Sequence, residues 1–247
     1  MALREELEQL GNRFFRWRSY LPLLLCVLFL IALKTVYYPL YPDFYDRLWE
    51  FFCLFVSFFG LIIRAWAVGS VPRGSSGRNV KEQRATALNT TGLYSLVRHP
   101  LYLGNFFMWI GAALLVRSWW LVLLTAFIFW FYYEKIMYAE EEFLRREFGE
   151  SFTKWANKTP AFFPTKLGNW QSPELKFSFR NALRREYSGF FAVISLFSVL
   201  RLFQDRITFG KFVIDQLWLK IFIIGLAVYL ILLVLKKKTK WLDVEGR

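Results

Sequence analysis

Long apolar runs alternate with shorter polar segments along this chain, and the pattern predicts about six membrane-spanning helices. A bilayer core about 30 Å thick requires about 20 mainly apolar helical residues. Six runs approach this length, and we expect each to be helical. They are residues 21–38, 49–69, 101–116, 119–137, 189–203 and 212–235. The expected fold class is therefore all-α, a polytopic integral membrane protein.

The charges support this assignment and orient the chain. Hydrophobic residues make up 56% of the sequence, yet the formal net charge is +13. Of the 32 Lys and Arg residues, 25 lie at alternate ends of the six runs. The positive-inside rule then places both termini and the two large loops in the cytoplasm. We expect the protein to lie in a cell inner membrane or the endoplasmic reticulum.

The sequence also argues against a nucleic-acid partner, a disulfide and a metal site. The basic residues flank apolar runs instead of forming a basic arm, so nucleic acid is not an expected partner. Cys26 and Cys53 both lie in apolar runs. We expect them to pack in the interior, without a disulfide or a metal site.

The third and fourth runs are separated by Arg117 and Ser118 alone, which predicts an antiparallel helical hairpin. The single histidine of the chain, His99, lies in Arg98-His99-Pro100 just before the hairpin, and Glu140-Glu141-Glu142 follows it. The hairpin therefore brings these two motifs to one face.

Each motif has a functional and a structural interpretation. Pro100 suits a first helical turn, and a helix N-terminus beside Arg98 favours a carboxylate or phosphate. Alternatively, Arg98 anchors the membrane edge, and the glutamates form i,i+4 pairs with Arg145 and Arg146 on a solvated face.

Three blocks of sequence carry a family resemblance. Residues 92–104, GLYSLVRHPLYLG, are similar to the signature G-x-Y-x-x-x-R-H-P-x-Y-x-G of the isoprenylcysteine carboxyl methyltransferase superfamily, which includes phospholipid methyltransferases. Residues 140–149 resemble its E-E-x-x-L-x-x-x-F-G, and residues 160–164 its P-x-F-x-P. The resemblance covers roughly residues 76–165. It divides the chain into two N-terminal helices (1–75), a methyltransferase-like core (76–165), and a linker with two C-terminal helices (166–247).

The resemblance implies an enzyme that binds S-adenosylmethionine at the cytoplasmic face and methylates a lipid or lipidated acceptor entering from the bilayer. It assigns no catalytic base and no metal. Further upstream, Asn79, Thr86 and Ala87 are weaker candidates for the cofactor pocket. The predicted cofactor-binding residues are Tyr94, Arg98, His99, Pro100, Leu101, Tyr102, Glu140, Glu141, Leu88 and Asn89.

One departure from the family concerns the acceptor. Carboxyl methyltransferases of this family carry an arginine four residues before the glutamate pair, where this chain has Ile136. The neighbouring Lys135 is the predicted substrate-binding residue, and snorkelling at a helix end is its structural alternative. The basic surface favours an anionic oxygen, a lipid phosphate or carboxylate, while an amine is the alternative acceptor.

Two other functions remain open. The hairpin also resembles the C-terminal half of sterol-type reductases, which bind NADPH, and Arg78, Lys81 and Arg84 would then face its phosphate. The other is a membrane protein that keeps the fold without catalysis. The chain contains no G-x-G-x-x-G and no P-loop, so soluble Rossmann-type binding is not supported.

Overall fold

The computed structural model describes residues 2–18, 20–36, 42–72, 85–165 and 167–246, and within these ranges the chain forms helices and no β-strand. The prediction of an all-α polytopic membrane protein is confirmed. The helices are α1 (Leu3–Trp17), α2 (Leu21–Leu33), α3 (Phe44–Gly69), α4 (Pro100–Leu115), α5 (Trp119–Ala156), α6 (Phe179–Phe209) and α7 (Gln216–Lys238), with 3₁₀ turns η1 (Gly92–Ser95) and η2 (Leu167–Asn169).

Four helices, α3, α5, α6 and α7, are long and apolar enough to cross a membrane. The other two predicted spans correspond to α4, with 16 residues, and α2, with 13 residues. At about 1.5 Å of rise per residue, neither reaches across a core of about 30 Å alone. A count of six spans therefore stays a prediction, and the end of the first predicted span, residues 37–38, lies outside the described residues.

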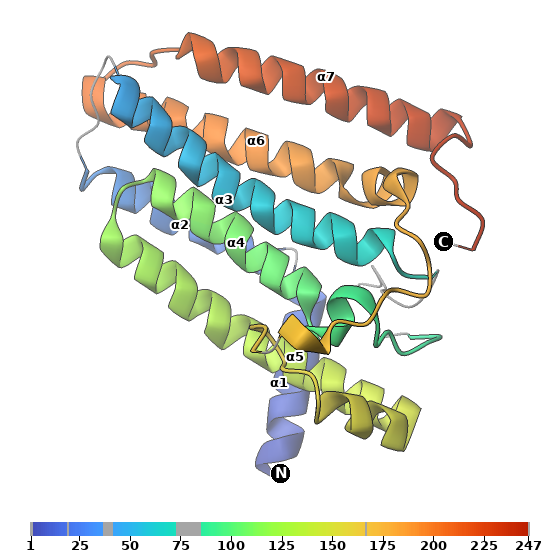
Figure 1. Cartoon of the computed structure of the whole chain (residues 1–247). Helices are drawn as coiled ribbons and strands as arrows, with labels where there is room; N and C mark the ends of the chain where they lie inside the picture. Colours follow the sequence, from blue (N-terminus) through green and yellow to red (C-terminus); the bar gives the residue numbers. More distant parts are fainter. Residues whose placement is uncertain (1, 19, 37–41, 73–84, 166, 247) are drawn as a thin grey trace.

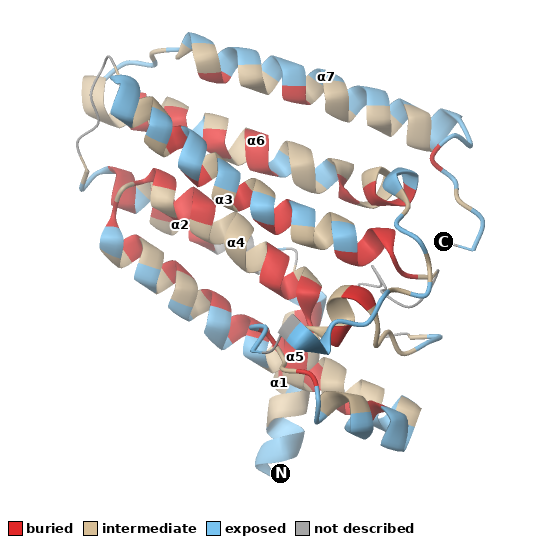
Figure 2. Ribbon diagram, viewed as in Figure 1, coloured by how far each residue is buried: buried red, intermediate tan, exposed pale blue. Residues whose placement is uncertain are grey.

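The long helices lie side by side in the order α7, α6, α3, α4, α5, with α2 behind them (Figure 1). The predicted antiparallel hairpin is formed by α4 and α5. The most extensive packing joins α3 and α4, where a Cβ atom added to Gly60 would lie 2.3 Å from the carbonyl oxygen of Gly104. Small residues allow such close approach between membrane helices. Buried positions gather on the inner faces of these helices, while α7 is largely exposed (Figure 2).

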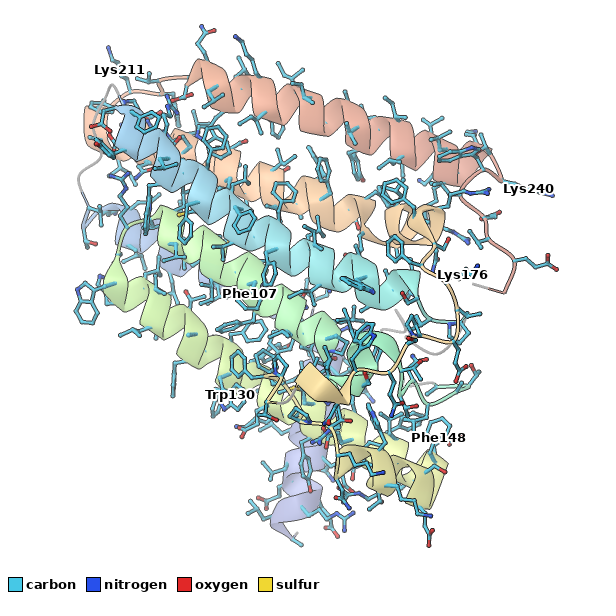
Figure 3. The ribbon with its side chains drawn as sticks, in the orientation of Figure 1. Phe107, Trp130, Phe148, Lys176, Lys211 and Lys240 are labelled. Carbon is cyan, nitrogen blue, oxygen red and sulfur yellow. The ribbon has the colours of Figure 1, made fainter. Side chains whose placement is uncertain are left out.

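The bundle has two distinct ends (Figure 3). Lys176, Lys240 and Phe148 lie toward one end, and Lys211 lies at the opposite end. This separation agrees with the alternation of charge in the sequence. We call the end that carries Lys176 and Lys240 the basic end.

The first helix, α1, crosses α5 and runs to the foot of the molecule (Figure 1). Gly11 packs against the backbone of Lys135, and a Cβ atom there would lie 2.1 Å from the Lys135 carbonyl oxygen. Arg146 of α5 pairs with Glu8 at 2.6 Å, and Arg4 pairs with Glu142. The sequence analysis did not predict this amphipathic helix, which docks on α5 through a glycine contact and two ion pairs.

A cluster of charged residues lies buried at the end opposite the basic end. Arg201 of α6 is 2% exposed and lies 3.5 Å from Glu50 of α3 and 3.1 Å from Asp205. Arg47 of α3 donates to Asp215, the N-cap residue of α7, at 2.5 Å. These charges join α3, α6 and α7 at that end.

Candidate functional site

The second family block lies on an extension of α5 beyond the predicted span 119–137. This helix of 38 residues carries Glu140 and Glu141 before it bends at Gly149, where φ is +53°. Glycine tolerates this left-handed backbone because it lacks a Cβ atom. The bend directs the remaining part of α5, through Ala156, toward the third block.

The first and third blocks are joined through their backbones. The N–H of Arg98 donates to the Pro160 carbonyl at 2.9 Å, and that of His99 donates to the Ala161 carbonyl at 3.1 Å. The Trp155 indole also donates to the Tyr94 carbonyl at 3.0 Å. The three blocks therefore meet at one place.

Arg98 makes hydrogen bonds to protein groups with most of its guanidinium. Its Nε and Nη2 atoms donate to the two carboxylate oxygens of Glu141 at 2.8 and 3.1 Å. Its Nη1 atom donates to the carbonyls of Ala156 and Thr159 at 2.8 and 2.6 Å. Such a bidentate pair fixes both side chains. Arg98 therefore orients Glu141 and the end of α5.

His99 lies between two carboxylates and is 6% exposed. Its Nε2 atom is 3.0 Å from Glu141 Oε1, and its Nδ1 atom is 3.6 Å from Glu140 Oε2. Burial by itself lowers the pKa of His99, but the hydrogen bonds to Glu140 and Glu141 outweigh it, so the pKa is raised above its ordinary value. The two carboxylates therefore favour the protonated, positively charged form of the imidazole.

Tyr102 links the helix N-terminus to Glu140. Its hydroxyl donates to Glu140 Oε1 at 2.6 Å. Its ring stacks on His99 with centroids 5.7 Å apart and contacts Tyr133 at 4.9 Å. Because the Glu140 side chain is 25% exposed, it keeps a face that a ligand can reach.

The helix N-terminus has less capacity for an anion than the sequence indicates. Pro100 is the first residue of α4 and has no N–H. The N–H groups of Tyr102 and Leu103 both donate to the His99 carbonyl at 3.1 Å. The first turn is thus largely satisfied within the protein.

The other predicted cofactor residues surround this group. Tyr94, Leu101, Leu88 and Asn89 are half-buried, and Thr86 and Ala87 are exposed. The remaining candidates fall within residues 73–84, outside the described residues; these are Asn79, Arg78, Lys81 and Arg84.

Lys135, the predicted substrate-binding residue, lies apart from the His99 group. Its ammonium pairs with Glu134 at 2.7 Å and lies 4.1 Å from the centre of the Phe131 ring. Within the described residues it has no contact with Tyr102 or Glu140. The neighbouring Ile136 is fully buried and supplies no charge.

The sequence analysis missed a second polar group. Arg64 of α3 pairs with both carboxylate oxygens of Glu186 of α6, each at 2.9 Å, and donates to Asn105 of α4 at 2.7 Å. The predicted span 49–69 contains Arg64, and the structure places it within α3, but no partner for its charge was predicted. The available signal was an arginine directly after an apolar run.

A cleft of about 1100 Å³ opens beside Arg98 at the ends of the second and third blocks. Trp155 and Trp170 contribute aromatic walls, and Lys154 and Lys158 contribute charge. Of the described residues that line it, Arg98 alone belongs to the predicted cofactor set. The cleft therefore adjoins the His99 group without being formed by it.

These features define a polytopic helical membrane protein with a histidine–carboxylate site at one end of a helical hairpin. Residues 48–151 match the family model described as phospholipid methyltransferase. This match and the isoprenylcysteine O-methyltransferase relatives support the resemblance to the superfamily of isoprenylcysteine carboxyl and phospholipid methyltransferases.

The curated relatives share part of the chain. The protein-S-isoprenylcysteine O-methyltransferase of Xenopus laevis is 32% identical over 145 residues, 56% of this chain and 49% of the relative. The enzyme of the same name in Schizosaccharomyces pombe is 33% identical over 85 residues, 34% of this chain and 36% of the relative. The nickel-cobalt-cadmium resistance protein NccN of Alcaligenes xylosoxydans xylosoxydans is 39% identical over 85 residues, 34% of this chain and 39% of the relative. The chain thus spans half or less of the relatives' lengths, and no solved structure matches it.

Proposed function

We propose that this protein is an integral-membrane methyltransferase that uses S-adenosylmethionine and methylates a lipid or lipidated acceptor. The observation that carries the proposal is the convergence of the three family blocks on His99, Tyr102 and Glu140. Methyltransferase relatives of the matched region support the same reaction class.

The chemistry of these side chains fits the proposed cofactor. S-adenosylmethionine, when bound, supplies an electrophilic methyl group on a sulfonium, and it also carries an amino group and a ribose diol. Glu140 offers a partly exposed carboxylate to the amino group or the diol. The rings of Tyr94 and Tyr102 suit a cation. The predicted set of Leu88, Asn89, Tyr94, Pro100, Leu101 and Tyr102 with His99 and Glu140 would hold it.

Arg98 and Glu141 have a different proposed role from the other members of the set. Their side chains satisfy each other and the Thr159 carbonyl, so they orient His99 and the backbone of the third block. We assign them as positioning residues. They act on the cofactor through the groups that they hold.

The protein's contribution to such a reaction is positioning and exclusion of water. An anionic acceptor oxygen needs no general base, because it already carries the reacting lone pair. On the membrane side, Phe162 of the third block is 3% exposed and packs against Phe129 and Trp130 of α5. This aromatic packing closes that side of the site to water.

The location follows from charge. The site lies at the basic end, and the positive-inside rule assigns that end to the cytoplasm. The proposed arrangement has both termini cytoplasmic, a catalytic core within residues 76–165, and the acceptor in the lipid phase. A cell inner membrane or the endoplasmic reticulum would suit it.

Cofactor titration tests the proposal. The full chain, purified in detergent, is titrated with S-adenosylhomocysteine and with NADPH while its melting temperature is followed. We expect S-adenosylhomocysteine to stabilise the protein, and His99→Ala and Glu140→Ala to remove that effect. Glu150→Ala is the matched control, because Glu150 lies on the same helix and is 89% exposed.

Each alternative function has its own outcome in this titration. Binding of NADPH alone would overturn the proposal in favour of a reductase. Binding of neither molecule would favour a protein without catalysis.

A further inference from the structure

The Arg64–Glu186 pair is unusual for its place in the bundle. Ionised residues within membrane-spanning helices are costly, and those that occur commonly mark substrate or ion pathways. Arg64 lies within the apolar helix α3, and its side chain is 19% exposed. Glu186 on α6 is 6% exposed. This pair therefore needs an explanation beyond the surface charge of a loop.

Arg64 retains capacity for another acceptor. A guanidinium has five N–H groups. Two of them reach Glu186 and one reaches Asn105. The other two N–H groups have no acceptor among the described residues. Gly104 lets the side chain lie against α4, since a Cβ atom there would be 2.5 Å from Arg64 Cγ.

A short chain of contacts joins Arg64 to the candidate cofactor site. Asn105, which accepts from Arg64, donates to the Tyr133 hydroxyl at 3.4 Å. The Tyr133 ring contacts Tyr102, whose hydroxyl donates to Glu140. Asn105 lies farther along α4 than Tyr102, so Arg64 lies on the membrane side of the site.

The electrostatics of Tyr94 place Arg64 in the same neighbourhood. Burial raises the pKa of the Tyr94 hydroxyl, Arg185 and Arg64 oppose this rise, and Glu140 adds to it. Arg64, Arg185 and Glu140 are therefore close enough to Tyr94 to affect its ionisation.

We propose that Arg64 binds the anionic oxygen of the methyl acceptor, the carboxylate or phosphate head group of a lipid. The proposal rests on the proposed function and names its acceptor class. Both oxygens of Glu186 accept from Arg64, so this position offers the acceptor a cation. The planar guanidinium matches a carboxylate or phosphate, and the Arg64 side chain is 19% exposed.

The step proposed at this position balances without a base. A lone pair of the anionic oxygen forms the new O–C bond as the S–C bond of the sulfonium breaks. The electron pair of the broken bond stays on sulfur, giving a neutral thioether. No proton is transferred.

A binding experiment tests the acceptor class without turnover. The full chain in detergent, saturated with S-adenosylhomocysteine, is titrated by calorimetry with decyl phosphate, decanoate, decylamine and inorganic phosphate. We expect the first two to bind, decylamine not to bind, and inorganic phosphate to bind more weakly than decyl phosphate. Equal affinity for inorganic phosphate would overturn a lipid acceptor, and preference for decylamine would overturn an anionic one.

Variants separate binding from structural support. Arg64→Gln should weaken decyl phosphate binding about tenfold or more, as expected for loss of a charged hydrogen bond, while Arg64→Lys should retain part of it. Glu186→Gln removes the competing carboxylate and should strengthen binding. If the Arg64–Glu186 pair is only structural, Glu186→Gln should not bind decyl phosphate more tightly.

The matched control is Arg47→Gln, because Arg47 also lies on α3 and pairs with carboxylates, at the opposite end of the bundle. It should leave decyl phosphate affinity unchanged. If Arg64→Gln binds S-adenosylhomocysteine and decyl phosphate as the original protein does, the acceptor role of Arg64 is wrong while the proposed function stands. If the original protein fails to bind S-adenosylhomocysteine, the proposed function itself fails.

Discussion

The Nε2 atom of His99 lies 3.0 Å from Glu141 Oε1, the same oxygen that accepts from Nε of Arg98 at 2.8 Å. One carboxylate thus receives two donors from adjacent residues of the chain. Because an ionised carboxylate is an acceptor only, Nε2 of His99 carries a proton here. The charge of His99 and the hold of Arg98 on α5 are therefore coupled through Glu141.

The first prediction concerns pH. The folded-state pKa of His99 is raised, with burial acting against the hydrogen bonds to Glu140 and Glu141. Its stabilising contribution is thus complete below the unfolded value of about 6.5 and is lost as pH rises through the folded pKa. The melting temperature should fall as the pH rises above about 6.5, more steeply than in His99→Gln. Since His99 is the single histidine, equal slopes would contradict its assigned charge.

The second prediction concerns Arg98, whose side chain is 16% exposed. Arg98→Ala leaves Glu141 and two carbonyls without their donor and should lower the free energy of unfolding by about 3 kcal/mol. Denaturant unfolding in mixed micelles measures this. Lys154→Ala breaks an exposed pair with Glu150 on α5, the helix that also carries Glu141, and should cause no measurable change. Similar effects of the two variants would show that Arg98 does not fix the site.

The third prediction separates two tyrosines. Tyr102→Phe removes the donor to Glu140 and should weaken S-adenosylhomocysteine binding about tenfold, the effect of one hydrogen bond to a charged group. Tyr132→Phe removes a hydroxyl that donates to the Phe14 carbonyl at 2.6 Å in the contact with α1. The affinity of the Tyr132→Phe variant for S-adenosylhomocysteine, measured by calorimetry, should be unchanged. A larger loss of S-adenosylhomocysteine affinity in Tyr132→Phe than in Tyr102→Phe would contradict the assignment of Tyr102 to the cofactor site.

The fourth prediction concerns α1. Gly11→Val places a side chain against the Lys135 backbone and should detach α1 from α5. Trypsin cleavage after Arg13 and Arg16, both exposed, should then become several-fold faster. Gly168→Val is the control, because a Cβ atom there meets nothing within 4 Å. Unchanged cleavage in Gly11→Val would mean that α1 is not held by this contact.

Much of the candidate site follows from local sequence. The two-residue turn at Arg117 and Ser118 forces a hairpin, and the hairpin brings His99 to Glu141 over a separation of 42 residues. Apolar run lengths likewise predict the helices. The hairpin and the helices depend on residues that are close together in the chain, so the local sequence reveals them.

Contacts between distant helices could not be predicted in this way. Arg64 and Glu186 are 122 residues apart, and Arg4 and Glu142 are 138 apart. From the local sequence alone, each of these four residues is interpreted as a charge in a loop or on the surface. Arg98 looked available for a ligand because its acceptors, Ala156 and Thr159, lie in a segment whose path depends on the bend at Gly149.

The buried cluster around Arg201 has a consequence for how the protein enters its membrane. A buried arginine in a membrane-spanning helix is costly unless it is paired, and Arg201 lies in the C-terminal third of α6. Glu50, which faces Arg201, belongs to α3 and is synthesised earlier, whereas Asp215 of α7 follows within a few residues of α6. We therefore expect stable integration of α6 to depend on α3 and α7, which supply these carboxylates. The order of synthesis places one acidic partner in the bilayer before the arginine arrives.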